Sequence, residues 1–293
     1  MAPIAVAVVF VAALIGLAIY IPEAAGKSLF IWVGTVPTLL FHLGMFLFWA
    51  TFALIVWWIA ERSLVSETRD RSQETVYRLL LVASSFFVFL LGFVVSQEWN
   101  NVNEVRRDVS TGAAAIDTAR YKAEALPPSE RAKVQDALSA LSRSIACQDL
   151  PAIRETGWGT QQTVTALRNA FLAVSGLPPS VRQESIFEDL LDEVGHVSES
   201  RRLILAGASS GLPGVVRIVI FIVAGLLITL FIIQSTKSRR AHKAMIVGLV
   251  LLVSVGTGMV ISLARPFGGS ATVEVDFDQA SRQGKSDCND SGT

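Results

Sequence analysis

The sequence predicts an all-α, polytopic membrane protein with about five transmembrane helices and a helical bundle inserted between the third and the fourth. Hydrophobic residues make up 52% of the 293-residue chain, charged residues make up only 17%, and the mean hydropathy is +0.50. This composition leaves too little polar surface for an ordinary soluble domain. Several charge-free runs are long enough to cross a bilayer, whereas the region from Glu98 to Gly211 has none and repeats apolar residues at helical spacing.

These patterns divide the chain into five parts. They are an N-terminal span and loop (1–28), the second and third spans (29–97), a water-soluble helical bundle (98–211), the fourth and fifth spans (212–264) and a polar tail (265–293). The first apolar segment, Ile4–Ile21, is preceded by no Lys or Arg. We therefore expect a retained span there, with a cleaved signal peptide as the alternative.

The second span is expected to follow a proline. A charge-free stretch begins at Leu29 and is longer than one straight span requires. Pro37 divides it, because proline removes a helical N–H donor and clashes with the preceding turn. We expect a short interfacial piece and then a full span, Thr38–Ala60. Trp57 and Trp58 near its end are expected at the headgroup level, where indole rings gather.

The chain is organised around one long helix, Leu79–Ala125. Its first half is free of charge as far as Gln97, close to the ~20 residues that cross a bilayer. Its second half is amphipathic, and no proline interrupts the pattern before Pro127. The sequence therefore predicts a helix that leaves the membrane and continues into water.

Three further apolar stripes with helical spacing predict the rest of the bundle. Their members are Val134, Leu138, Leu141 and Ile145; then Val164, Leu167, Phe171 and Val174; then Phe187, Leu190, Leu191, Val194 and Val197. A region of this length can bury a helical core of its own.

A short L-P-x-x-x-R motif occurs three times, beginning at Leu126, Leu177 and Leu212. Proline is favoured in the first turn of a helix, and Ser129 and Ser180 are suitable capping residues. We interpret the three motifs as helix starts. The alternative is an ancient duplication of a helical hairpin.

The last two spans are predicted at Val215–Ser235 and Ala244–Ala264, joined by a basic hairpin, Thr236–Lys243. Small residues in membrane spans allow helices to approach closely. We assign that role to four of them: Gly225, Gly248, Ser254 and Gly258.

Several function classes are disfavoured. The three histidines have no second His or Cys at metal-ligand spacing, and no nucleotide or nucleophile motif occurs, so we predict no enzyme, no metal site and no cofactor. No basic domain points to nucleic acid. The spans lack Asp, Glu and Lys, which disfavours an ion-coupled pump. Cys147 and Cys288 are the only cysteines, and whether they pair is left open.

Positive charge in the short loops predicts the orientation. Glu61–Arg78 holds four Lys or Arg residues, Thr236–Lys243 also holds four, and Pro22–Ser28 holds one. The two rich loops are therefore expected in the cytoplasm, with the bundle and the tail outside it. Arginines near the ends of the bundle favour the opposite orientation: Arg106, Arg107, Arg201 and Arg202.

The order of these segments resembles the bestrophin-like family of bacterial membrane proteins over roughly residues 38 to 280. The most specific motifs are Gly211-Leu212-Pro213 before the fourth span and Arg265-Pro266-Phe267 after the last. The family typically carries Ser after that Phe and Pro in the following segment. Here Gly268 stands after the Phe, and Val275 or Asp276 stands in place of the Pro.

The resemblance implies a distant kinship to bestrophins, which are pentameric anion channels with a hydrophobic neck. Leu91-Gly92-Phe93 matches the bestrophin pattern at that neck, and the neck residues would be Ser85, Phe89 and Phe93. Val94 stands where bestrophins carry Arg, and no acidic cluster resembles their calcium clasp. Bestrophins keep their helical domain in the cytoplasm, opposite to the orientation that the loop charges predict.

The leading hypothesis is therefore a homo-oligomeric protein of the bacterial cytoplasmic (inner) membrane that conducts small anions passively. The rival hypothesis is a non-conducting membrane scaffold or sensor whose bundle binds a partner protein. Both place the chain in a lipid bilayer.

Overall fold

The computed structural model describes residues 38–63, 73–182, 185–209, 212–234 and 239–264. Within these residues the regular structure is entirely helical, which confirms the all-α prediction. Four of the described helices are long and apolar enough to cross a membrane. The first predicted span, Ile4–Ile21, lies outside the described residues, so the count of five spans stays a prediction.

The chain forms two compact units. The membrane unit comprises Met1–Trp99 with Leu212–Ala264, and the bundle unit comprises Asn100–Gly211 with Arg265–Thr293. Each unit has its own buried apolar core. The finer division of the sequence into five parts stays a prediction.

Helix α5, Gln73–Ala123, contributes to both units and is 51 residues long. It is one uninterrupted helix, as the absence of proline predicts. It begins six residues before Leu79 and ends two residues before Ala125. The additional residues at its start are mostly polar, so they do not belong to the apolar run that predicted the helix.

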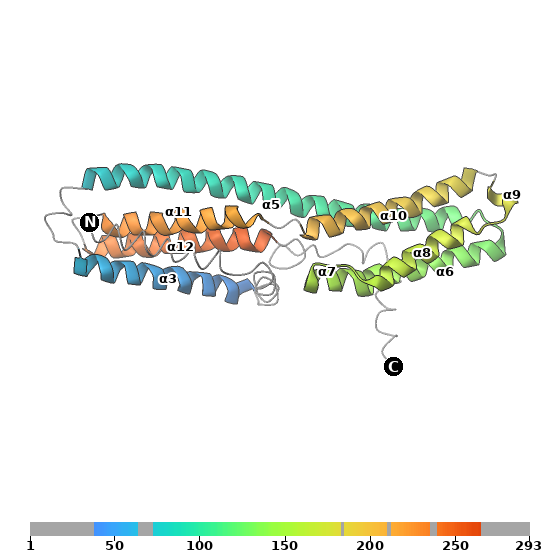
Figure 1. Cartoon of the computed structure of the whole chain (residues 1–293), viewed down its shortest axis with the longest axis horizontal. Coiled ribbons are helices and arrows are strands. Elements are labelled where there is room, and N and C mark those ends of the chain that lie inside the picture. The colour runs from blue at the N-terminus through green and yellow to red at the C-terminus, as the bar shows by residue number, and fades with distance from the viewer. Residues whose placement is uncertain (1–37, 64–72, 183–184, 210–211, 235–238, 265–293) are drawn as a thin grey trace, which may run out of the picture. The chain divides into compact units, whose positions relative to one another are not determined.

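Three more helices complete the described part of the membrane unit. They are α3, Thr38–Ser63, α11, Gly214–Ile233, and α12, Arg239–Leu263. Figure 1 shows them beside the first part of α5. The expected hairpin Thr236–Lys243 is too long, because α12 already begins at Arg239. Arg, Ala and Lys are good helix formers, and no Gly or Pro ends the helix there.

Trp49 of α3 lies at the centre of the membrane unit. Its side chain is fully buried and stacks on Phe221 of α11, with the ring centroids 5.6 Å apart. Its indole Nε1 donates a hydrogen bond to Oγ1 of Thr257 on α12 at 3.1 Å. One aromatic side chain thus connects three helices and satisfies its polar atom inside an apolar core.

The glycines confirm part of the predicted helix contacts. A Cβ atom on Gly258 would lie 3.1 Å from the His42 ring, and one on Gly225 would lie 3.5 Å from the Phe52 ring. Gly248 has open space around it, so its assigned role is wrong. Among the described glycines of the membrane unit the closest approach is at Gly256, where a Cβ would lie 2.9 Å from Cδ1 of Leu91 on α5.

The bundle unit contains the second part of α5 and six shorter elements. They are α6, Pro128–Ser144, the π-helix η1, Ile145–Asp149, α7, Leu150–Thr156, α8, Gln161–Ser175, α9, Pro179–Arg182, and α10, Ser185–Ser209. The three predicted amphipathic helices are confirmed as α6, α8 and α10. The stripe on α8 was wrong at Val164, which is 40% exposed. Thr163 is buried in its place, because its hydroxyl bonds with that of Ser144 at 2.9 Å.

All three L-P-x-x-x-R motifs are helix starts, as predicted, but the caps differ. The structure records no side-chain cap for α6. Instead, the Arg131 guanidinium donates to the carbonyl oxygen of Leu126, and Arg182 donates to that of Leu177. In these two motifs the arginine therefore binds the carbonyl group of the leucine that opens the motif.

The π-helix η1 was not predicted from the sequence. It is followed by Pro151, whose nitrogen cannot donate the hydrogen bond of a regular helix. The wider π turn, with Leu150 N–H bonded to Ile145 O, accommodates this proline. Cys147 lies in the same turn, while Cys288 lies outside the described residues, so whether the two pair stays open.

Candidate pore-lining face of α5

The three residues predicted for a neck lie on one exposed face of α5. Phe89 is 72% exposed and Phe93 is 63% exposed, and Ser85 is exposed as well. At about 100° per residue, Ser85 and Phe93 are only about 80° apart around the helix. The membrane unit leaves all three uncovered by its own helices.

Packing on the opposite side of α5 fixes this orientation. Leu80, Phe87 and Val94 are buried in the core of the membrane unit, with Phe87 only 1% exposed. Leu91 lies against Gly256 of α12. These contacts hold the helix in one rotation about its axis, so the neck residues cannot turn inward without emptying the core.

Two small residues share the exposed face and were not predicted as part of the site. Gly92 follows Ser85 by seven residues, and Ser96 follows Phe89 by seven, so each lies two turns along the same face. A Cβ atom on Gly92 would meet no other atom within 4 Å. The seven-residue spacing of these small residues from Ser85 and Phe89 is visible in the sequence and could have identified them as part of the same face. A face that combines Phe with Ser and Gly is less apolar than lipid contact requires and is typical of a helix interface or a pore.

The nearest charged group points elsewhere. Glu98 is on the buried side of α5 and is only 4% exposed. No hydrogen-bond partner is recorded for its Oε2 atom. The exposed face therefore carries no charge between Leu79 and Gln97.

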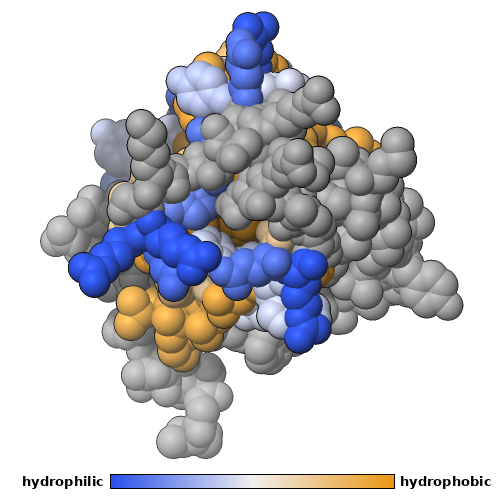
Figure 2. Space-filling model, turned by 90° about the vertical axis from the view of Figure 1, so that its left-hand side faces the viewer, coloured by the Kyte–Doolittle hydropathy of each residue, from blue (hydrophilic) through white to orange (hydrophobic). Residues whose placement is uncertain are grey.

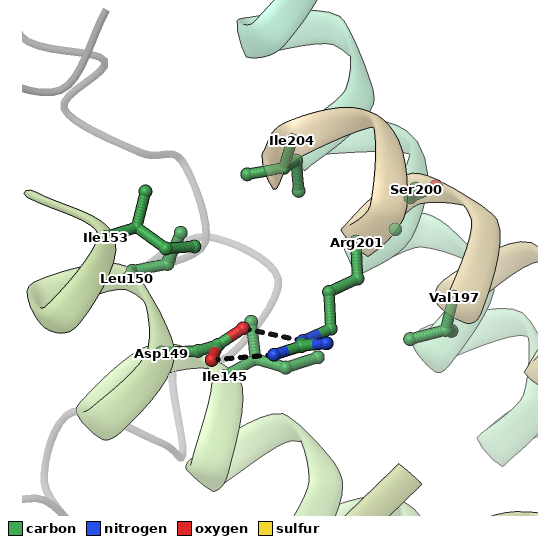
Figure 3. Close-up of a pocket in the computed structure, with 9 residues that line it drawn as sticks. Ile145, Asp149, Leu150, Ile153, Val197, Ser200, Arg201 and Ile204 are labelled. Atoms are coloured by element: carbon green, nitrogen blue, oxygen red, sulfur yellow. Dashed lines mark hydrogen bonds and ion pairs between the residues drawn. The ribbon is translucent and has the colours of Figure 1, made fainter. Parts of the chain in front are cut away.

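The bundle unit contains a polar cluster around Asp149, shown in Figure 3. The Asp149 carboxylate accepts hydrogen bonds from Nε and Nη2 of Arg201 at 2.7 and 3.1 Å. It also accepts one from the backbone N–H of Thr160 at 2.5 Å. The adjacent cavity is lined mainly by apolar side chains, and its two charged groups, Asp149 and Arg201, bind each other. This cluster holds the bundle together and offers no free group to a ligand.

The other predicted site residues fall outside the described part of the chain. Arg265, Pro266 and Phe267 belong to the segment 265–293, and their role stays a prediction. Among the described residues, no group of three or more His, Cys, Asp or Glu side chains is arranged to hold a metal ion.

Comparisons with known proteins agree with this architecture. A family model described as the bestrophin-like domain matches residues 47–276. A crystal structure of a bacterial bestrophin homologue from Klebsiella pneumoniae, carrying a Leu-to-Thr substitution, is similar with a TM-score of 0.61 and 13% identity over 86% of this chain and 99% of that chain. The crystal structure of a membrane protein with a Pro-to-Ala substitution matches with the same values. No curated protein matches the sequence.

Proposed function

Because this chain belongs to the bestrophin-like family, we propose that it is a homo-oligomeric channel that conducts small anions passively across the bacterial cytoplasmic membrane. In this proposal the exposed face of α5 lines the pore. Phe89 and Phe93 form a hydrophobic constriction, and the hydroxyl groups of Ser85 and Ser96 flank it. The channel needs no cofactor and catalyses no reaction.

The observation that carries the proposal is the exposure of this face. Phe89 and Phe93 are the most exposed phenylalanines of α5, although Phe87 on the same helix is fully buried. Several copies arranged around an axis would bring these faces together and surround the axis with rings of Phe and Ser. Hydrophobic rings gate ion flow by dewetting, and they require no buried carboxylate.

Sidedness is part of the proposal. At one end of the membrane unit, the end of α3, the start of α5 and the start of α12 carry five described cations: Arg62, Arg78, Arg239, Arg240 and Lys243. The positive-inside rule puts these ends in the cytoplasm. The bundle unit is then extracytoplasmic.

The test is anion flux in proteoliposomes. The double variant Phe89→Ala with Phe93→Ala should conduct chloride several-fold faster than the wild type, because a wider and less apolar constriction wets more easily. The oligomeric state of both proteins is measured in parallel. A stable ring is expected.

The matched control is Leu54→Ala on α3. Leu54 is 69% exposed, so it loses a comparable apolar surface outside the proposed pore. Its flux should equal that of the wild type. Absence of chloride flux in the wild type and in the double variant would refute the channel and leave the membrane scaffold whose bundle binds a partner protein.

A further inference from the structure

One end of the membrane unit is strongly cationic. The end of α3 carries Arg62, and the start of α12 carries Arg239, Arg240 and Lys243, all exposed. Arg78 near the start of α5 is at the same end but binds Glu74 at 2.6 Å. Figure 2 views this end and shows hydrophilic side chains, in blue, next to hydrophobic ones, in orange.

Aromatic rings hold two of these cations at the boundary between apolar and polar surface. The Arg62 guanidinium carbon lies 4.1 Å from the centroid of the Trp58 ring, and the Lys243 ammonium lies 5.9 Å from that of Trp57. Trp58 itself is 56% exposed. Cation–π contacts use the face of a ring and leave the N–H groups of the cation available to an anion.

Trp57 is held in place by the helix packing behind it. The Trp57 ring lies 5.7 Å from the ring of His242, which is buried and stacks on Phe231 of α11. His242 directly precedes Lys243 in α12, so the packing of His242 determines the direction in which the Lys243 side chain projects from the helix. Arg239 lies one turn earlier on the same side of α12 as Lys243.

We propose that Arg62 and Lys243, supported by Arg239, bind the phosphate of an anionic phospholipid, with Trp57 and Trp58 against its glycerol and upper acyl region. The described carboxylates at this end are Glu61 and Glu74, and Arg78 neutralises the second. The cluster therefore keeps an excess of positive charge at the depth where a headgroup lies.

The opposite end of the same unit lacks this chemistry. Its described residues contribute two charged groups, Arg217 and Glu98. Glu98 is buried and Arg217 is partly buried, whereas the cations of the other end are exposed. The positive-inside rule accounts for the asymmetry of charge, and the specific feature of the cationic end is that aromatic rings hold two of its cations. The site does not depend on conduction, so it can be tested whether or not the channel is confirmed.

The experiment measures the thermal unfolding of the purified full-length protein in a neutral detergent. Phosphatidylglycerol should raise the Tm, whereas zwitterionic phosphatidylcholine and inorganic phosphate at the same concentration should leave it nearly unchanged. In the double variant Arg62→Gln with Lys243→Gln, the rise caused by phosphatidylglycerol should fall to less than half. Native mass spectrometry should show correspondingly fewer bound phosphatidylglycerol molecules.

The control removes two cations from the bundle unit, Lys133→Gln with Arg168→Gln. It should retain the full rise in Tm. The conservative variant Lys243→Arg should retain it too, which separates loss of binding from misfolding. Equal shifts with phosphatidylcholine, an equal shift with free phosphate, or an undiminished shift in the Arg62 and Lys243 double variant would each overturn the proposal.

Discussion

At Asp149, one carboxylate joins three parts of the bundle unit. It comes from η1, it pairs with Arg201 of α10, and it accepts the N–H group of Thr160 immediately before α8. Its side chain is 2% exposed and that of Arg201 is 15% exposed. Two charges removed from water to this degree stabilise the fold only while each satisfies the other.

Asp149→Asn is therefore expected to destabilise the bundle unit. The substitution keeps the shape of the side chain but leaves the Arg201 guanidinium buried without its counter-charge. Breaking a buried pair costs about 3–5 kcal/mol. Thermal unfolding followed by loss of protease resistance in the bundle should show a clearly lower Tm.

Asp192→Asn is the matched control for this variant. The Asp192 side chain is 76% exposed and pairs with His196 one turn away on α10. Exposed pairs contribute about 0–1 kcal/mol, so its Tm should stay close to the wild-type value. Equal Tm values for the two variants would contradict a structural role for the buried pair.

At the scale of elements, the rotation of α5 depends on its contact with α12. Gly256→Ala should destabilise the membrane unit by about 0.5–1.5 kcal/mol, because its Cβ would lie 2.9 Å from Cδ1 of Leu91, so that this side chain must leave its rotamer or α5 must shift slightly. Gly248→Ala on the same helix should be neutral or slightly stabilising, because that position is open and Ala favours helix. Thermal unfolding in detergent compares the two.

A double-variant cycle tests the mechanism. Leu91→Ala removes the side chain that Gly256→Ala would strike, so the combination should be less destabilised than the sum of the single variants. Strict additivity would mean that the Leu91 contact does not determine the spacing of α5 and α12. The same shift would move the exposed face of α5, so Gly256→Ala is also expected to change anion flux if that face lines the pore.

The sequence predicts elements here better than it predicts contacts between them. An apolar and then amphipathic pattern without proline was enough to place α5. The choice of Ser85, Phe89 and Phe93 came from the resemblance to bestrophins, and their four-residue spacing puts them on one face of this helix. Helical periodicity alone does not indicate which helix a given face packs against. It therefore assigned Gly248 rather than Gly256 to a helix contact, and it counted Val164 as buried because it cannot foresee that Ser144 satisfies Thr163.

The candidate sites were hard to predict for the same reason, because they depend on contacts between residues far apart in the sequence. Asp149 and Arg201 are 52 residues apart, and no local pattern joins them. The cationic end of the membrane unit was predicted as charged loops. Its contact between Arg62 and Trp58 lies within α3, whereas the contact between Lys243 and Trp57 required the packing of α3 against α12. In the proposed oligomer the exposed face of α5 would be surrounded by other copies of the chain, and neither periodicity nor a single chain shows those copies.

At the scale of the whole molecule, the open question is which side of the membrane each unit faces. The loop charges put the cationic helix ends in the cytoplasm, whereas the resemblance to bestrophins puts the bundle there.

Two single-cysteine variants decide between the orientations, made in a background in which Cys147 and Cys288 are both replaced by Ser. Ser129→Cys introduces a thiol at the exposed start of α6, and Glu74→Cys introduces one at the start of α5, where the native side chain is 79% exposed. A membrane-impermeant maleimide applied to intact cells should label Ser129→Cys and leave Glu74→Cys unlabelled until lysis, because positively charged loops stay in the cytoplasm. Each variant controls the other for thiol reactivity. The reverse pattern would put the bundle unit in the cytoplasm, and the charge of the short loops would then not determine the topology of this protein.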